Sequence, residues 1–314
     1  MQRDYQSLLD HIGSSKAWDM SRKHGGLRML PPFGLPQYHT GNYNGTIEAL
    51  NAVAAYIRRI PQKHVVLLLG NMAANIDLDA AIRQHEKAGT DATAICAGQG
   101  LESMHSNYIL GEDGLVKYID LFRTGEANGI PSLEGYIFHK DKLLELMDLC
   151  RARNLHRFHQ DAIVHFLKEG GRMDAYVHPD YARVIRTVDE YYAASRDVLR
   201  PEVRRELFPA DRPVRTKIHE DVSTYYGEQA RSRNSLVGDN CIIEGEIEDC
   251  IVFSGCHIGP GAKLKGCILM RNCDVEANAR LDYVIADKGA CFSKDSVLIG
   301  SPKLPTVVPK DGRI

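Results

Sequence analysis

The chain has 314 residues, of which 44% are hydrophobic and 25% are charged, the proportions of an ordinary globular protein. Its formal net charge of −2 excludes the broad positive field that binds nucleic acid or anionic membranes. No apolar run approaches the ~20 residues of a membrane-spanning helix, and the N-terminus lacks the apolar core of a secretory signal. We therefore expect a cytoplasmic protein without nucleic-acid or membrane partners.

Residues 1 to about 200 alternate helical and strand-like patterns. The segment "GTIEALNAVAAYIRRI" has apolar residues at helical spacing, and the aliphatic run 65–69 that follows it predicts a buried strand. The next helix is predicted in "DLDAAIRQHEKAG", with Asp77 as its N-cap and Gly89 after its last turn. Further strands are predicted at 91–98 and 135–138, and further helices after Lys140 and at 189–199, where Pro201 ends the last one. This alternation predicts a mostly parallel sheet covered by helices.

The C-terminal part follows a repeat. Ile258, Val275 and Phe292 recur at one constant step along the chain, and Cys256 and Cys273 are separated by the same step. Hexads of one aliphatic and one small residue, about three per coil, predict a short β-helix of about four coils. We expect an α/β domain at 1–205, a polar linker at 206–234 and a left-handed β-helix at 235–314.

The same repeat explains the cysteines. Six of the eight lie between residues 241 and 291, and they contain no C-x-x-C pair. They fall where small side chains of successive coils stack, so we expect buried thiols and neither disulfides nor a metal cluster.

Several segments together carry a resemblance to a known family. They are "SLLDHIGSSKAWDM", "YNGTIEALNAVAAYIRR", "GNMAANIDLDAAIRQHEKAGTDAT", "VDEYYAASRDVL" and "IGSPKLPTVVPK". The chain resembles the ADP-glucose pyrophosphorylase (glucose-1-phosphate adenylyltransferase) family along nearly its whole length. The resemblance implies a Rossmann-like nucleotidyltransferase domain followed by a left-handed parallel β-helix. The sequence starts beyond the family's Gly-rich nucleotide loop, so we expect an N-terminally truncated domain without the usual ATP site.

The departures from the family's catalytic members concern the site. The resemblance places a Mg²⁺-binding Asp after Gly70, where this chain has Asn71, and an Asp before Phe158, where it has Arg157. The family's Trp-Arg-Asp element becomes Ala182, Arg183 and Val184 here, and no Glu-Lys-Pro motif accompanies Lys117. We therefore predict a site without catalytic residues and without a metal. The resemblance also implies that one cluster is a remnant of a sugar-phosphate pocket: Tyr43, Gly45, Thr46 and Glu48.

Other residues suggest alternative chemistry. His156, His159 and Asp161 have the spacing of a zinc corner, but such pairs arise by chance and Asp161 is typical of a helix start. His257 is placed as in β-helix acyltransferases, where a His acts as base. No partner carboxylate is evident in the sequence, so we favour a surface histidine. Arginines at 58–59, 151–157 and 204–205 are candidates for an anionic effector site.

The sequence as a whole predicts a non-catalytic regulatory subunit. The resemblance implies a catalytic ADP-glucose pyrophosphorylase subunit as its partner, in a hetero-oligomer expected to be a tetramer. The partner would make ADP-glucose from ATP and glucose 1-phosphate with Mg²⁺, whereas this chain would need no cofactor by itself. A sugar phosphate is the expected effector. Two alternatives stay open: an active glucose-1-phosphate adenylyltransferase and, more remotely, an acyltransferase that uses the β-helix.

Overall fold

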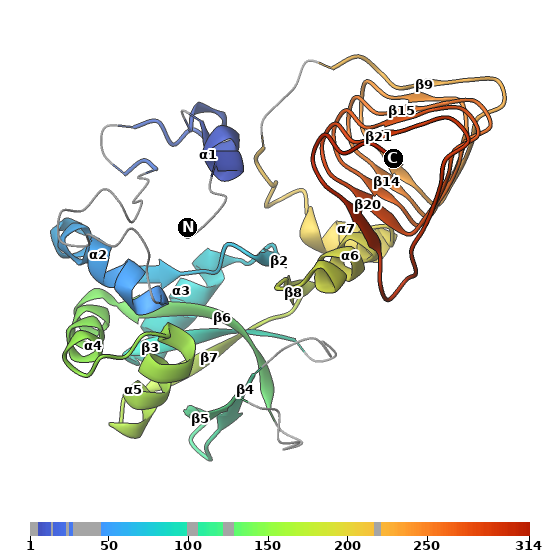
Figure 1. Ribbon diagram of the computed structural model, residues 1–314. Coiled ribbons are helices and arrows are strands. Elements are labelled where there is room, and N and C mark those ends of the chain that lie inside the picture. The colour runs from blue at the N-terminus through green and yellow to red at the C-terminus, as the bar shows by residue number, and fades with distance from the viewer. Residues whose placement is uncertain are drawn as a thin grey trace. The chain divides into compact units, whose positions relative to one another are not determined.

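A computed structural model describes residues 6–13, 15–22, 25–27, 45–98, 106–121, 129–216 and 221–314 (Figure 1). The chain divides into two compact units. The first unit comprises residues 1–184 and 210–217, and the second comprises residues 185–209 and 218–314. In the described residues, no helix combines the length and the apolar character needed to cross a membrane.

The first unit is a mixed α/β domain. Its helices are α1 (Gln6–Ile12), η1 (Lys16–Trp18), α2 (Thr46–Arg59), α3 (Leu78–Ala88), α4 (Lys140–Ala152), the π-helical turn η3 (Phe158–Ile163) and α5 (Val164–Lys168). Its strands are β1 (His64–Leu67), β2 (Met72–Ala74), β3 (Ala92–Ala97), β4 (Asn107–Leu110), β5 (Val116–Asp120), β6 (Ile130–His139), β7 (Met173–His178) and β8 (Ala182–Val184).

The main sheet has the order β5-β4-β6-β3-β7, and β1 also pairs with β6. Only β3 and β7 are parallel among the described pairs of this sheet, because the long strand β6 runs antiparallel to β1, β3 and β4. The expectation of a mostly parallel sheet is therefore wrong. The reason is that β6, which follows the β4–β5 hairpin in the chain, lies between β1 and β3 and runs antiparallel to both.

The three helices that the sequence predicts in this unit form as α2, α3 and α4. α2 buries Ile47, Ala54 and Ile57 on one face, in a core that includes the aromatic side chains of β6. The side chain of Asp77 accepts a hydrogen bond from the amide of Ala80 (2.8 Å) and caps α3. Gly89 ends α3 with φ of +59°, a left-handed conformation that favours glycine. The predicted caps of α3 are confirmed.

The second unit begins with two helices, α6 (Val188–Asp197) and α7 (Pro201–Leu207), and continues as a parallel β-helix. The prediction that Pro201 ends α6 is wrong, since α6 ends at Asp197 and Pro201 is the first residue of α7, where its missing N–H costs no hydrogen bond. The coils contain β9 (Tyr225–Tyr226), β10 (Arg231–Arg233), β11 (Leu236–Val237), β12 (Ile242–Ile243), β13 (Glu246–Glu248), β14 (Ile251–Val252), β15 (His257–Ile258), β16 (Lys263–Lys265), β17 (Ile268–Leu269), β18 (Asp274–Val275), β19 (Arg280–Asp282), β20 (Val284–Ala286), β21 (Cys291–Phe292), β22 (Val297–Ile299) and β23 (Thr306–Val308).

The strand register reproduces the sequence repeat. Ile258 lies opposite Val275 and Val275 opposite Phe292, each pair in adjacent parallel strands. The strands of the coils form three sheets of five strands each. The predicted fold class, an α/β domain followed by a short left-handed parallel β-helix, is confirmed.

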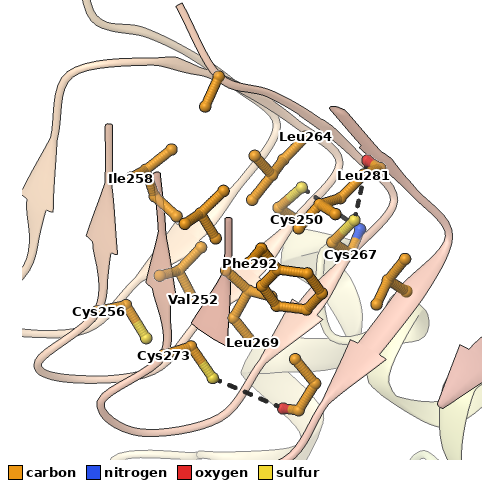
Figure 2. Close-up of a cluster of buried hydrophobic side chains, with 14 of the residues drawn as sticks. Cys250, Val252, Cys256, Ile258, Leu264, Cys267, Leu269, Cys273, Leu281 and Phe292 are labelled. Carbon is orange, nitrogen blue, oxygen red and sulfur yellow. Dashed lines mark hydrogen bonds between the residues drawn. The ribbon is translucent and has the colours of Figure 1, made fainter. Parts of the chain in front are cut away.

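The interior of the β-helix is apolar and holds most of the cysteines (Figure 2). All eight cysteines are free thiols, and seven of them are buried. The thiols of Cys256 and Cys273 donate hydrogen bonds to the carbonyls of Met270 (3.1 Å) and Asp287 (3.2 Å). The cysteines therefore pack as small buried side chains, as the repeat predicts, and these two thiols in addition hydrogen-bond to backbone carbonyls.

The predicted domain boundaries at 205 and 234 differ from this division. In α6, Tyr192 packs against Ile268 and Ile285, and its hydroxyl donates a hydrogen bond to the carbonyl of Gly266 (2.6 Å). The helix thus belongs to the β-helix unit. The predicted linker contains β9 and β10, which are strands of the first coil, and residues 210–216, which pack on the first unit.

Candidate functional site

The first candidate region lies where β1 ends. Gly70 and Asn71 form the turn between β1 and β2, and the side chain of Asn71 is exposed. β2 pairs antiparallel with β8, so that Met72 lies opposite Val184. Asn71 therefore lies beside the end of β8. Asn71 and Val184 are far apart in the sequence but meet at this edge. The family resemblance expects a carboxylate at each of the two positions.

This edge does not fit a magnesium ion. Mg²⁺ requires hard oxygen ligands, most often carboxylates. Asn71 offers only an amide oxygen, and Val184 is an apolar side chain that is 1% exposed. The residues at both positions therefore lack the negative charge that would hold the metal and offset the charge of a phosphate.

A cavity of about 370 Å³ lies beside β2. Its walls are mostly apolar and are formed by Leu68, Met72, Ala74, Asn75, Ile76, Leu78, Arg212, Pro213 and Val214. The guanidinium of Arg212 is 3.2 Å from Asp180 and 4.0 Å from Asp77, and the carbonyl of Arg212 accepts a hydrogen bond from Asn75 (2.8 Å). The cation in this cavity is already neutralised, so it is not available to bind a phosphate.

The second candidate region surrounds Arg157. The guanidinium of Arg157 donates to Asp161 (2.8 Å), and its backbone amide donates to the same carboxylate (2.9 Å). These hydrogen bonds hold the pKa of Asp161 below its usual range. Asp161 therefore lies in the first turn of η3, which begins at Phe158, and its carboxylate accepts from the N-cap amide of Arg157 and neutralises the guanidinium.

The predicted remnant of the sugar-phosphate pocket packs against the same segment. The hydroxyl of Thr46 accepts a hydrogen bond from the amide of Phe158 (2.9 Å), and Glu48 is 3.5 Å from His156. A Cβ at Gly45 would lie 2.2 Å from the carbonyl oxygen of His156, so only glycine permits this approach. Tyr43, the fourth predicted member, lies outside the described residues. The three described members fix the segment 156–158 in place.

A buried polar network next to this segment was not predicted. The Tyr108 hydroxyl donates to the Tyr136 hydroxyl (2.8 Å), which in turn donates to Nδ1 of His159. Nε2 of His159 is 2.7 Å from the Ser106 hydroxyl. Since Tyr136 donates to Nδ1, the proton of the neutral ring is on Nε2 and points at Ser106. Burial raises the pKa of Tyr136, which keeps its hydroxyl protonated.

The histidines do not form the zinc corner considered for the sequence. His159 is turned toward Tyr136 and Ser106, whereas His156 lies near Glu48. Throughout the described part of the chain, no group of three His, Cys, Asp or Glu side chains is arranged to hold a metal ion.

The candidate arginines have partners of their own. Arg58 and Arg151 both pair with Asp148, at 3.0 and 3.3 Å. Arg204 donates to the carbonyls of Val198 and Leu199. These contacts give each of the three arginines a structural role in its own region.

His257 has two partner carboxylates, contrary to our expectation. It is outward-facing as predicted, with Nδ1 2.8 Å from Asp274 and Nε2 3.3 Å from Glu244. Both carboxylates come from neighbouring coils, so neither of them is adjacent to His257 in the sequence. Burial alone would lower the pKa of His257, but the hydrogen bonds to Asp274 and Glu244 outweigh it and raise the pKa.

This arrangement predicts a pH-dependent contribution to the stability of the β-helix. Because the pKa of His257 is higher in the folded chain than in the unfolded chain, the contribution is complete below about pH 6.5 and is lost as the pH rises through the folded value. His257→Gln should lower the unfolding free energy by under about 1 kcal/mol in acid and by less in base, because the pairs are exposed. Urea unfolding at several pH values measures this difference. A difference that grows with pH would contradict the assignment.

The fold and the site define the class of protein. It has an α/β domain, in which Asn71 and Val184 stand where carboxylates are expected, and a hexapeptide β-helix. The profile of the family described as "GlmU-like, C-terminal hexapeptide" matches residues 218–303. The chain is 28% identical over 307 residues to the "Glycogen biosynthesis protein GlgD" of Bacillus subtilis, covering 98% of this chain and 79% of that protein.

Two further relatives carry the name "Glucose-1-phosphate adenylyltransferase". The protein of Halalkalibacterium halodurans is 28% identical over 310 residues, which is 97% of this chain and 81% of the relative. That of Desulfitobacterium hafniense (strain DSM 10664 / DCB-2) is 26% identical over 289 residues, which is 90% of this chain and 72% of the relative. The resemblance to the glucose-1-phosphate adenylyltransferase family, and to its GlgD-type member, is confirmed along nearly the whole chain.

Proposed function

We propose that this chain is a non-catalytic regulatory subunit of glucose-1-phosphate adenylyltransferase, acting in glycogen biosynthesis in the cytoplasm. The observation that carries the proposal is the juxtaposition of Asn71 and Val184 at the edge of β2 and β8. Nucleotidyl transfer with Mg²⁺ needs anionic oxygen ligands, and the family resemblance expects a carboxylate at each of these two positions. The names of the relatives, GlgD and glucose-1-phosphate adenylyltransferase, support the pathway.

The partner in this proposal is a catalytic subunit of the same family, in a hetero-oligomer. The subunit would supply the ATP and Mg²⁺ sites, and this chain would change its activity or its response to a sugar-phosphate effector. Such regulation requires only that this chain binds more tightly to one state of the partner than to another. The well-packed segment 156–158 supports this role, since the α/β unit keeps a fixed shape without the catalytic carboxylates.

The test is the synthesis of ADP-glucose from ATP and glucose 1-phosphate with Mg²⁺. It compares the purified full chain, a catalytic subunit from the same cell, and an equimolar mixture. We expect no turnover by this chain alone, and a higher rate or a changed effector response in the mixture. A mixture with a heat-inactivated preparation of this chain serves as control.

If this chain alone synthesises ADP-glucose and Asn71→Ala abolishes that synthesis, the proposal is overturned in favour of an active adenylyltransferase. The acyltransferase alternative gains no support from the structure. A general base needs a ring nitrogen that can reach the substrate, and carboxylates face both nitrogens of His257.

A further inference from the structure

Three histidines of the α/β unit meet where β1 begins, at the end of the strand opposite to Asn71. His64 is the first residue of β1, His139 is the last residue of β6, and the two lie directly opposite each other in the ladder. His85 comes from the last turn of α3. The ring of His64 stands edge-on to both others, with centroids 5.1 Å from His85 and 5.9 Å from His139.

The buried ring, His85, is poorly placed to take up a proton. It is 3% exposed, and its Nδ1 is 2.9 Å from the hydroxyl of Thr93, which is fully buried. Burial, and then the neighbouring His64 and His139, lower the pKa of His85. Three cationic rings at these separations would repel one another, and one of them would be cut off from water.

The charged groups around the cluster only partly offset this repulsion. Glu86 of α3 is 3.6 Å from His64, and Asp141 of α4 is 4.0 Å from His139, but both carboxylates are more than half exposed. Asp174 of β7 attracts a proton on His85, yet it already accepts a hydrogen bond from Gln84 (2.8 Å). Nearby Lys140 adds positive charge and donates to the carbonyl of Ile60 (3.1 Å).

The strand that the cluster holds lies at an edge of the sheet. Among the described strands, β1 pairs only with β6, along four residues. Two residues after its carboxyl end, the chain enters the turn with Gly70 and Asn71. Separation of His64 from His139 would therefore begin to release β1 at its first pair.

We propose that His64, His85 and His139 form an acid-sensitive latch that holds the edge strand β1 on β6. With His85 neutral, the three rings pack edge to face and close the latch. A proton on His85 would place a charge out of reach of water, which favours an open state in which β1 separates from β6. Since the pKa of His85 is lowered, this stability is complete above about pH 6.5 and is lost as the pH falls through the folded value. The latch is thus an acid response of the α/β unit that is independent of any catalytic role.

The experiment is hydrogen exchange of β1 in the full chain at about pH 7.5 and about pH 5.5, with exchange times corrected for the intrinsic effect of pH. A single histidine that stays neutral in the closed state changes the opening equilibrium by about tenfold over this interval. We expect the protection of β1 to fall at least to this extent, while the protection of β7 stays constant.

Variants identify the groups responsible. His85→Gln keeps a polar partner for Thr93 but cannot be protonated, so it should retain most of the protection of β1 in acid. His64→Gln serves the same purpose if His85→Gln does not fold. His165→Gln, at a histidine that pairs with Arg153 and Glu169 in another part of the unit, should leave the acid response unchanged. An acid response equal in β1 and β7, or one that persists in both His85→Gln and His64→Gln, would overturn the latch.

Discussion

Replacement of His159 with leucine is expected to lower the unfolding free energy of the α/β unit by about 1–3 kcal/mol for each buried hydroxyl left without a partner. Leucine fills a similar volume, so the loss comes from hydrogen bonds and not from a cavity. Ser106 and Tyr136 are 3% and 1% exposed, and the hydroxyl of each would lose its hydrogen bond with His159, whereas the Tyr136 hydroxyl would keep the one from Tyr108. We therefore expect the full loss at Ser106 and a smaller one at Tyr136.

Urea unfolding followed by the fluorescence of Trp18 measures this loss. Trp18 is the single tryptophan of the chain and lies in the α/β unit. The control is His156→Leu, three residues earlier in the same segment, where the side chain is 38% exposed. We expect that variant to lose under about 1 kcal/mol. Equal losses in the two variants would show that the network around His159 does not stabilise the fold.

Phe292→Ala is expected to cost about 3–5 kcal/mol in the stability of the β-helix. Phe292 is fully buried in the interior of the β-helix (Figure 2). In the strand register it lies opposite Val275 of the coil before it. Truncation removes apolar contacts and leaves a cavity, because strands tied to their neighbours by ladder hydrogen bonds cannot close in.

Phe253→Ala is the matched control, since Phe253 is in the same unit but is 43% exposed. Its loss should stay under about 1 kcal/mol. Thermal unfolding followed by far-ultraviolet circular dichroism compares the two variants. A Phe253→Ala protein that melts as early as Phe292→Ala would contradict the assigned core of the last coil.

The sequence was sufficient to predict the β-helix because its register is local. Ile258, Val275 and Phe292 are related by a constant step, and the same step sets their contacts. The strands of the first coil were not predicted, because their own sequence does not show the repeat. Tyr225 and Arg231 lie in a polar stretch that reads as a linker, and their strands become evident only once they pair with later coils.

The α/β unit was less predictable because its contacts join distant segments. The single-strand patterns of β1, β3 and β6 gave their positions but not the antiparallel direction of β6. The meeting of Asn71 with Val184 depends on the pairing of β2 with β8, two strands of three residues each that carry little signal. The partners of His159 likewise come from β6 and from the start of β4, and no spacing rule connects them.

The regular coil has a consequence for how this chain can change in length. From Ile251 onward, adjacent strands are offset by one constant block of sequence, so loss or gain of one such block leaves every remaining strand facing an equivalent neighbour. Val284 and its partner Thr306 are separated by a longer stretch of sequence. The additional residues form an outer loop and do not disturb the stacking of the coils. Evolution can therefore shorten or extend this domain by whole turns, whereas the α/β unit, whose strands pair out of chain order, has no comparable freedom.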